Sequence, residues 1–233
     1  MSRLLIMATS TPQRRRSRGI STIEILAATA LTLLLLAVAS SFFVSQQRML
    51  LVQSAYSQSQ NVTRTFTDLF GRELRMAGFD PTGVAISKSG TGAGISCPSV
   101  VQAITLATQD SIGFKQDLNG DGDTADASEQ VTYSLSNGQI MRQDGNATPI
   151  SLVNGVASGG FIIQYFNNSY PAVQLTNFSG NPGALNQGDR DCIGKVRVRL
   201  TAQLASPQFF DIQPLISSID SQVAVRNRSL VNF

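Results

Sequence analysis

Residues 14–44 read RRRSRG and then ISTIEILAATALTLLLLAVASSFFV, and this stretch decides the fold. A basic segment ends at Gly19, and the 20 residues from Ile25 to Val44 contain no charge, glycine or proline. A helix rises about 1.5 Å per residue, so this run is long enough to span the hydrocarbon core of a bilayer, about 30 Å thick. Glu24 lies at the edge of the run, where a carboxylate next to lipid is costly and needs a reason.

Two ordinary N-terminal segments explain this stretch poorly. A secretory signal peptide has an apolar stretch of about 7–15 residues, followed by small residues at a cleavage site. Here the run is longer, and no A-x-A site follows it. A plain signal anchor explains the length and the orientation, but it gives no reason for Gly19 or Glu24.

The segment from Gly19 to Leu26 resembles the class III signal of type IV prepilins and type II secretion pseudopilins, in which Gly precedes Phe-Thr-Leu-Ile-Glu. The resemblance implies cleavage after Gly19 by a membrane-embedded prepilin peptidase and N-methylation of Ile20, the new first residue. It also implies a role in assembly for Glu24, the fifth mature residue. This chain has Ile in place of Phe, and Ser-Thr in place of Thr-Leu.

Removal of residues 1–19 changes the charge balance of the chain. The whole chain has 18 Lys and Arg against 15 Asp and Glu, and five of the arginines lie in the leader, which contains no acid. The mature chain therefore has 13 basic and 15 acidic residues, a side-chain net charge of −2. The basic leader indicates which end stays in the cytoplasm, and it is poor evidence for nucleic-acid binding. Met7 is an alternative start that keeps the arginines next to the cut.

The apolar run continues into an amphipathic helix. From Ile20 to Ala77 there is one glycine, Gly71, and no proline. Beyond the membrane segment, apolar residues recur mostly at steps of three or four, the period of a helix with one buried face. They are Val52, Ala55, Tyr56, Val62, Phe66, Leu69, Phe70, Leu74 and Ala77. We expect one helix over residues 20–78, with residues 20–44 in the membrane, ending near Gly78 and Pro81.

Residues 79–233 are rich in turn-forming residues and short β-prone runs, which predicts one β-rich globular domain outside the cytoplasm. The expected strands are Val100–Ala107, Ser111–Gln116, Gln130–Ser136, Gln139–Gln143, Ile150–Val153, Phe161–Phe166, Lys195–Gln203 and Ser221–Arg228. Asn137 and Gly138 offer a hairpin turn between two of them. Lys195, Arg197 and Arg199 alternate with apolar residues, as on a strand with one solvated face.

Three patches in this region resemble minor pilins of the PilW type. Residues 73–83, ELRMAGFDPTG, are similar to a segment LRMAGYDPTG of that family. The stretch from Phe114 to Arg142, which includes Glu129 and Tyr133, follows the same layout, and residues 225–228 resemble the closing strand. The pseudopilin J group of type II secretion is similar.

The chain has two cysteines, Cys97 and Cys192, and no histidine. Both cysteines follow the membrane segment, and in an oxidising compartment a lone pair is usually a disulfide. Such a bridge would close a long loop and stabilise the domain by about 4–5 kcal/mol in the chain-entropy model. Two separate thiols are the alternative. The lack of histidine excludes His-based zinc sites and His-dependent catalytic triads.

The acidic segment from Asp117 to Glu129 is a candidate cation site. Oxygen ligands at alternate positions with a glycine for the tight turn suit Ca²⁺. The ligand candidates are Asp117, Asn119, Asp121, Asp123 and Glu129. The acid expected at the twelfth position falls on Ser128, and Glu129 is one residue late. A solvated turn without a metal is the alternative.

The sequence therefore predicts an α+β, pilin-like fold and a minor type IV pilin that takes part in pilus assembly, near the filament tip. The expected partners are the prepilin peptidase, other minor and major pilins, and the inner-membrane assembly platform, with no nucleic acid. We expect a single-pass inner-membrane protein with a periplasmic C-terminal domain, reaching the pilus after assembly. No enzymatic motif is present. A J-type pseudopilin and a membrane-anchored, calcium-dependent adhesion module are the alternatives.

Overall fold

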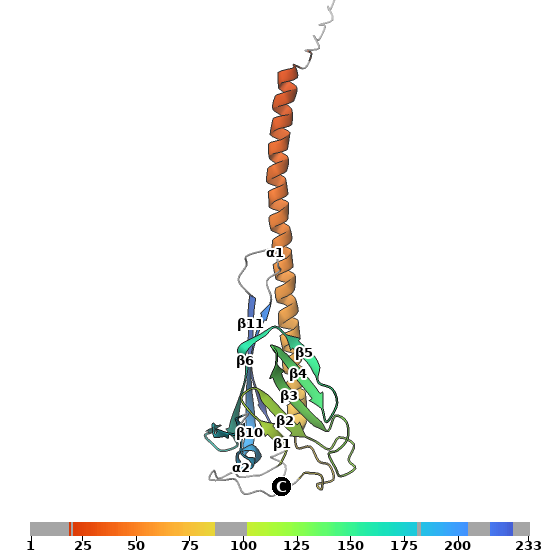
Figure 1. Cartoon of the computed structure of the whole chain (residues 1–233), viewed down its shortest axis with the longest axis vertical. Coiled ribbons are helices and arrows are strands. Elements are labelled where there is room, and N and C mark those ends of the chain that lie inside the picture. The colour runs from red at the N-terminus through yellow and green to blue at the C-terminus, as the bar shows by residue number, and fades with distance from the viewer. Residues whose placement is uncertain (1–18, 20, 87–101, 181–182, 205–214, 226–233) are drawn as a thin grey trace, which may run out of the picture. The chain divides into compact units, whose positions relative to one another are not determined.

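The structure is a computed structural model that describes residues 19, 21–86, 102–180, 183–204 and 215–225 (Figure 1). The first element is α1 (Thr22–Met76), followed by antiparallel strands. The chain divides into two compact units, with the boundary between Leu51 and Val52. The first unit holds the apolar part of α1, and the second holds the rest of α1 and the sheets. The predicted α+β architecture is confirmed, and α1 lies within two residues of the expected bounds.

Helix α1 ends where the glycine signal predicts. Gly78 has a φ of 78°, and the Phe79 N–H donates to the Met76 carbonyl at 2.8 Å. Glycine adopts this left-handed conformation without the steric cost of a Cβ, so it closes helices well. The Gly78 N–H donates to the Lys115 carbonyl at 2.9 Å, which ties the helix end to the sheet.

The β domain contains a five-stranded antiparallel sheet in the order β1-β2-β3-β4-β5 and a four-stranded sheet in the order β11-β10-β6-β7. A two-stranded ribbon, β8-β9, and a short helix, α2, complete the described elements. Their bounds are β1 Ile104–Ala107, β2 Ser111–Lys115, β3 Gln130–Ser136, β4 Gln139–Asp144, β5 Ile150–Asn154, β6 Val156–Asn167, β7 Gln174–Leu175, β8 Phe178–Ser179, β9 Ala184–Leu185, α2 Gln187–Asp191, β10 Ile193–Leu204 and β11 Leu215–Ala224.

The predicted Asn-Gly hairpin joins β3 to β4. Asn137 and Gly138 have φ values of 50° and 70°, and the flanking residues Ser136 and Gln139 are paired. Positive φ at both central residues is the geometry of a type I′ turn, which matches the twist of the flanking strands. This turn fixes the register that places Tyr133 opposite Arg142.

The core forms where α1 packs between side chains of both sheets. The ring of Phe66 lies 6.0 Å from the ring of Tyr133 on β3 and 6.0 Å from the ring of Phe161 on β6. Phe70 lies 5.1 Å from Tyr133. Phe66, Phe70 and Leu74 are all buried and follow at steps of four, so one stripe of α1 supplies the helix contribution to the core.

Near residue 60, the residues that α1 buries differ from the predicted apolar positions. Ser59 and Thr63 are buried, whereas Tyr56 is 41% exposed and Val62 is 36% exposed. The steps of three and four from Phe66 back through Thr63 to Ser59 keep these residues on the buried face of the helix. The Thr63 hydroxyl donates to the Ser59 carbonyl at 2.7 Å, so its burial leaves no unsatisfied donor.

Several strand bounds also differ from the expected ones. The expected strand Phe161–Phe166 is the second half of β6, and Ser221–Arg228 overlaps only the end of β11, which starts at Leu215. Residues 226–228 and 100–101 lie outside the described residues. Lys195–Gln203 falls inside β10, and its alternation is confirmed, since Arg197 and Arg199 lie on the solvated face.

Candidate functional site

The predicted processing site lies immediately before α1. Gly19 is exposed, and a Cβ built on it would meet no atom within 4 Å. Ile20, the predicted new N-terminus, lies outside the described residues. Cleavage and methylation stay predictions.

Glu24 lies in the first turn of α1. Its N–H donates to the Ser21 carbonyl at 3.0 Å, and the Ile25 N–H donates to the same carbonyl at 3.2 Å. The first turn carries the positive end of the helix dipole, which favours an acidic side chain there. Glu24 is exposed in the single subunit, so its carboxylate is open to a partner.

The first half of α1 presents apolar side chains on every side. Ile23 is 72% exposed, Leu33 67% and Phe42 65%. Among the described residues, α1 is the one helix long and apolar enough to cross a membrane. Its hydroxyls do not oppose this, because Thr29, Thr32, Ser40 and Ser41 donate to carbonyls three or four residues earlier in the helix.

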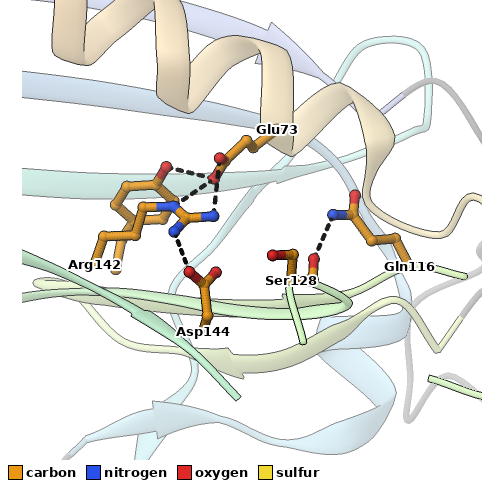
Figure 2. Close-up of polar contacts among 6 residues, drawn as sticks. Glu73, Gln116, Ser128, Arg142 and Asp144 are labelled. Carbon is orange, nitrogen blue, oxygen red and sulfur yellow. Dashed lines mark hydrogen bonds and ion pairs between the residues drawn. The ribbon is translucent and has the colours of Figure 1, made fainter. Parts of the chain in front are cut away.

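A polar cluster ties the amphipathic half of α1 to β3 and β4, and we name Glu73, Tyr133, Arg142 and Asp144 the Glu73 anchor. The Tyr133 hydroxyl donates to Glu73 Oε2 at 2.6 Å. Arg142 Nε donates to the same oxygen at 3.1 Å, and Arg142 Nη2 lies 3.0 Å from Glu73 Oε1. Arg142 Nη1 donates to Asp144 at 2.5 Å. Figure 2 shows Glu73 on the helix facing Arg142 and Asp144 on the strands.

The charges in the Glu73 anchor fit its surroundings. Burial raises the pKa of the Tyr133 hydroxyl well above its usual range, and the bond to Glu73 adds to this. Burial alone would lower the pKa of Arg142, but the hydrogen bonds to Glu73 and Asp144 raise it above its usual value. Tyr133 therefore stays a neutral donor and Arg142 a cation across the physiological pH range. The charge-assisted pair of Glu73 and Arg142 joins α1 to the sheet. Its geometry fixes the orientation of the helix and its position along its own axis.

The DPTG motif and the acidic loop form a second junction at the end of α1. Asp80 accepts from the N–H groups of Gly83 at 2.7 Å and Ile86 at 3.0 Å, which closes the turn on itself. The Asp117 N–H donates to the Phe79 carbonyl at 2.8 Å, and Asp117 Oδ2 accepts from Thr82 at 3.5 Å. Two of the three patches that resemble minor pilins are therefore packed against each other.

The acidic loop is folded by its own backbone. Asp117 is buried, and it accepts from the N–H groups of Gly120 at 2.6 Å and Gly122 at 3.2 Å. Glu129 is also buried, and it accepts from the N–H groups of Leu118 at 2.9 Å and Asp126 at 3.3 Å. These two carboxylates, the deepest of the predicted calcium ligands, close the two ends of the loop.

The remaining predicted ligands lie at the surface of the loop. Asn119 accepts from the Asp121 N–H, and Asp121 from the Asp123 N–H, both at 3.0 Å. The Asp123 N–H bond lowers the pKa of the Asp121 carboxyl, and the Asn119 side chain adds to the effect. In the described part of the chain, no three His, Cys, Asp or Glu side chains gather in a group that could hold a metal ion. The calcium site stays a prediction.

The residue at the twelfth loop position has a structural role. Ser128 has a φ of 69°, and its carbonyl accepts from the Gln116 side chain at 3.0 Å (Figure 2). This left-handed residue turns the chain into β3 and directs Glu129 back into the loop. This turn explains why the acidic residue, Glu129, follows the twelfth loop position, Ser128, by one residue.

A model of the family described as Prepilin peptidase-dependent protein B matches residues 52–218. The chain belongs to this family. The match covers more than half of the chain and contains both junctions described above, and it begins after the apolar half of α1. No curated protein matches the chain. The PilW-type assignment rests on the resemblance alone.

The predicted disulfide is the remaining candidate feature. Cys192 is 1% exposed and lies between α2 and β10, where it caps the short helix that begins after Asn186. Cys97 lies outside the described residues, so the bridge stays a prediction.

Sequence reasoning found part of the Glu73 anchor. Tyr133 and Arg142 both lie in the stretch that resembles minor pilins, and in the structure the Asn137-Gly138 hairpin places them opposite each other. Asp144 was missed, although it follows Arg142 by two residues and therefore lies on the same face of β4. The position of Glu73 opposite them depends on the packing of α1, which no local signal gives.

Proposed function

We propose that the protein is a minor type IV pilin of the PilW type, stored in the inner membrane and assembled into a filament after processing. The observation that carries the proposal is that two independent features meet in one chain. The Gly19–Glu24 signal lies at the start of α1, and the family match covers residues 52–218 without including that signal. The family description, which names dependence on the prepilin peptidase, agrees with the signal.

The proposed mechanism depends on the exposed apolar half of α1. Lipid covers this surface in the stored subunit, and helices of neighbouring pilins cover it in the filament. Cleavage creates a positive amine at Ile20, close to Glu24. Two opposite charges in an apolar bundle are each costly alone, so Glu24 pairs with an amine of its own chain or a neighbour. That pair sets the axial stagger between subunits.

The second half of α1 gives the globular domain its connection to the filament. Phe66, Phe70 and Leu74 bury one stripe against the sheets, and the Glu73 anchor adds a charge-assisted pair. A pull on the helix during extraction from the membrane is therefore transmitted to the domain through packed side chains. We propose a non-enzymatic role, with the peptidase, other pilins and the inner-membrane assembly platform as partners, and a periplasmic domain before assembly.

Processing is tested by replacing Gly19 with leucine in cells that carry the peptidase. A side chain at this position should crowd the scissile bond, so Gly19→Leu should accumulate a precursor that retains about 19 leader residues. Ser17→Leu, two residues before the cut, is the matched control and should be processed normally. Intact-mass measurement of membrane extracts distinguishes the forms. A mature mass for Gly19→Leu would contradict the prepilin assignment.

A second measurement separates the pilus from type II secretion. Loss of the protein should remove or shorten surface fibres and leave secreted enzymes at normal levels. Loss of secreted enzymes with normal fibres would instead identify a pseudopilin.

A further inference from the structure

Strand β11 is a long edge strand whose outer side no described strand covers. All ten of its residues pair with β10 in one register, from Leu215 opposite Leu204 to Ala224 opposite Lys195, without a bulge. It stands at the end of its sheet, so half of its backbone N–H and C=O groups point outward. Such a row of groups is a template for another strand.

The other terminal strands of the two sheets are protected. Strand β1 has four residues and a bulge, and β7 has two residues. Strand β5 has five residues and an irregular register with β4. Short strands and bulges are the usual means of preventing unwanted pairing. Strand β11 has neither, and its sequence LISSIDSQVA contains no Pro, Gly or Lys.

The one charge on β11 is already used within the sheet. Asp220 accepts from Arg197 at 2.7 Å and 2.6 Å, and it lies 3.5 Å from Arg199. The first of these contacts lowers the pKa of the Asp220 carboxyl, which therefore stays ionised and paired. The carboxylate of Asp220 is held over β10, so it does not protect the open edge of β11 from pairing with another strand.

A groove opens between this edge and α1. Helix and strand are close at one end, where a Cβ on Gly71 would lie 3.6 Å from a methyl carbon of Val223. About 16 Å from Gly71 towards the start of α1, and about 17 Å from Val223 towards the start of β11, the two elements leave a space of about 390 Å³. The groove is lined by Tyr56, Gln60, Asn61 and Arg64 of α1 and by Ile216, Ser217, Ser218 and Ile219 of β11.

The charge of the groove indicates what it would bind. Arg64 is exposed and forms no ion pair or hydrogen bond within the described part of the chain. It is the one charged side chain among the described residues that line the groove. A guanidinium beside a row of backbone groups suits an extended chain that carries a carboxylate.

We propose that β11 and this groove bind an extended, acid-bearing segment of a partner polypeptide, which adds as a fifth strand to the four-stranded sheet. Backbone bonds to β11 would supply the pairing, and an Asp or Glu of the segment would pair with Arg64. A second copy of this chain fits less well, because the only acid on its own edge strand is held by Arg197 and Arg199. The proposal does not depend on filament membership.

The test measures binding of labelled peptides to the full-length protein in detergent micelles. The probes are seven-residue Thr-Val peptides, acetylated and amidated, with one Asp at the third, fourth or fifth position. Matched controls carry Asn in place of Asp, or N-methyl groups on alternate backbone amides. Fluorescence anisotropy gives the affinity, and hydrogen exchange reports protection of the β11 amides.

At least one Asp peptide should bind and slow exchange in β11, and its Asn and N-methyl forms should bind at least tenfold more weakly. Arg64→Glu should weaken binding at least tenfold. Arg72→Glu, which changes another exposed arginine of α1 that forms no ion pair within the described residues, should change it less than twofold. Equal binding to Arg64→Glu and wild type, equal binding of the N-methyl peptide, or no binding by any probe up to millimolar concentration would overturn the proposal. A dimer that Ile216→Lys dissolves would also overturn it, since a second copy would then occupy the edge.

Discussion

The Glu73 anchor makes a quantitative prediction about the stability of the globular domain. Glu73→Gln keeps the size of the side chain but removes the negative charge that holds Arg142. The side chains of Glu73 and Arg142 are 16% and 13% exposed, so the pair is largely shielded from water. Hydrogen bonds to charged groups contribute about 1.5–3 kcal/mol each, and breaking a fully buried pair costs about 3–5 kcal/mol.

The expected loss is at the lower end of that range. Arg142 keeps its bond to Asp144 and some access to water, and the glutamine still accepts from Tyr133. We therefore expect Glu73→Gln to reduce the free energy of unfolding by about 2–3 kcal/mol. For a domain of this size, about 2–4 °C of melting temperature corresponds to each kcal/mol, so the midpoint should fall by about 4–12 °C.

The assay is thermal or urea unfolding of the full-length protein in micelles, monitored by the near-ultraviolet signal of the buried tyrosines. Asp68→Asn is the matched control, because Asp68 is an exposed acid five residues earlier on the same helix without an ion pair within the described residues. It should change the stability by less than about 0.5 kcal/mol. A double-mutant cycle with Arg142→Met should return a coupling energy above about 1 kcal/mol. If Glu73→Gln is as stable as Asp68→Asn, the anchor does not stabilise the domain.

Three further predictions concern titration, oxidation and cation binding. Burial raises the pKa of both Tyr133 and Tyr165, so folded tyrosines keep their protons above pH 10 while unfolded ones lose them. Stability should therefore be constant below about pH 10 and fall above it by up to about 2.7 kcal/mol per pH unit; a Tyr133→Phe variant that keeps the full slope would refute this assignment. If Cys97 and Cys192 are bridged, the oxidised protein should run faster on a non-reducing gel than the reduced one, and labelling of two thiols in the native protein would exclude the bridge. If the acidic loop binds Ca²⁺, added calcium should raise the melting temperature and Asp121→Ala should abolish the rise, whereas identical melting in calcium and in chelator would favour the turn without a metal.

The sequence predicts the elements that depend on local signals. The run from Ile25 to Val44 and the absence of helix breakers before Gly78 predict α1, because length and composition alone decide whether such a helix forms. The Asn137-Gly138 turn predicts the β3–β4 register, because positive φ values at both positions require those residue types. Each of these features is determined by residues that are neighbours in the chain.

The junctions depend on long-range packing and were not predictable in the same way. Glu73 lies 69 residues from Arg142 in sequence, and only the packing of α1 between the sheets brings the two side chains together. Strand β11 was placed too late because its inward residues Ser217 and Ser221 are small and polar. All ten residues of the strand pair with β10 in one register, so pairing specifies β11 without a regular apolar alternation. A hydrophobic-pattern rule does not recognise a strand that is specified in this way.

The central claim, that α1 serves filament assembly and not only anchoring, is tested most directly at Glu24. We expect Glu24→Ala to be cleaved and to remain in the membrane, because loss of a charge eases insertion of an apolar helix. Its share of sheared surface fibres should fall at least tenfold, since the amine of Ile20 or of a neighbouring subunit loses its partner. Thr29→Ala is the matched control, because its hydroxyl is bonded within the helix, and it should be incorporated like wild type. Normal incorporation of Glu24→Ala, or the absence of the wild-type protein from every fibre fraction, would contradict the account and favour a membrane-anchored module.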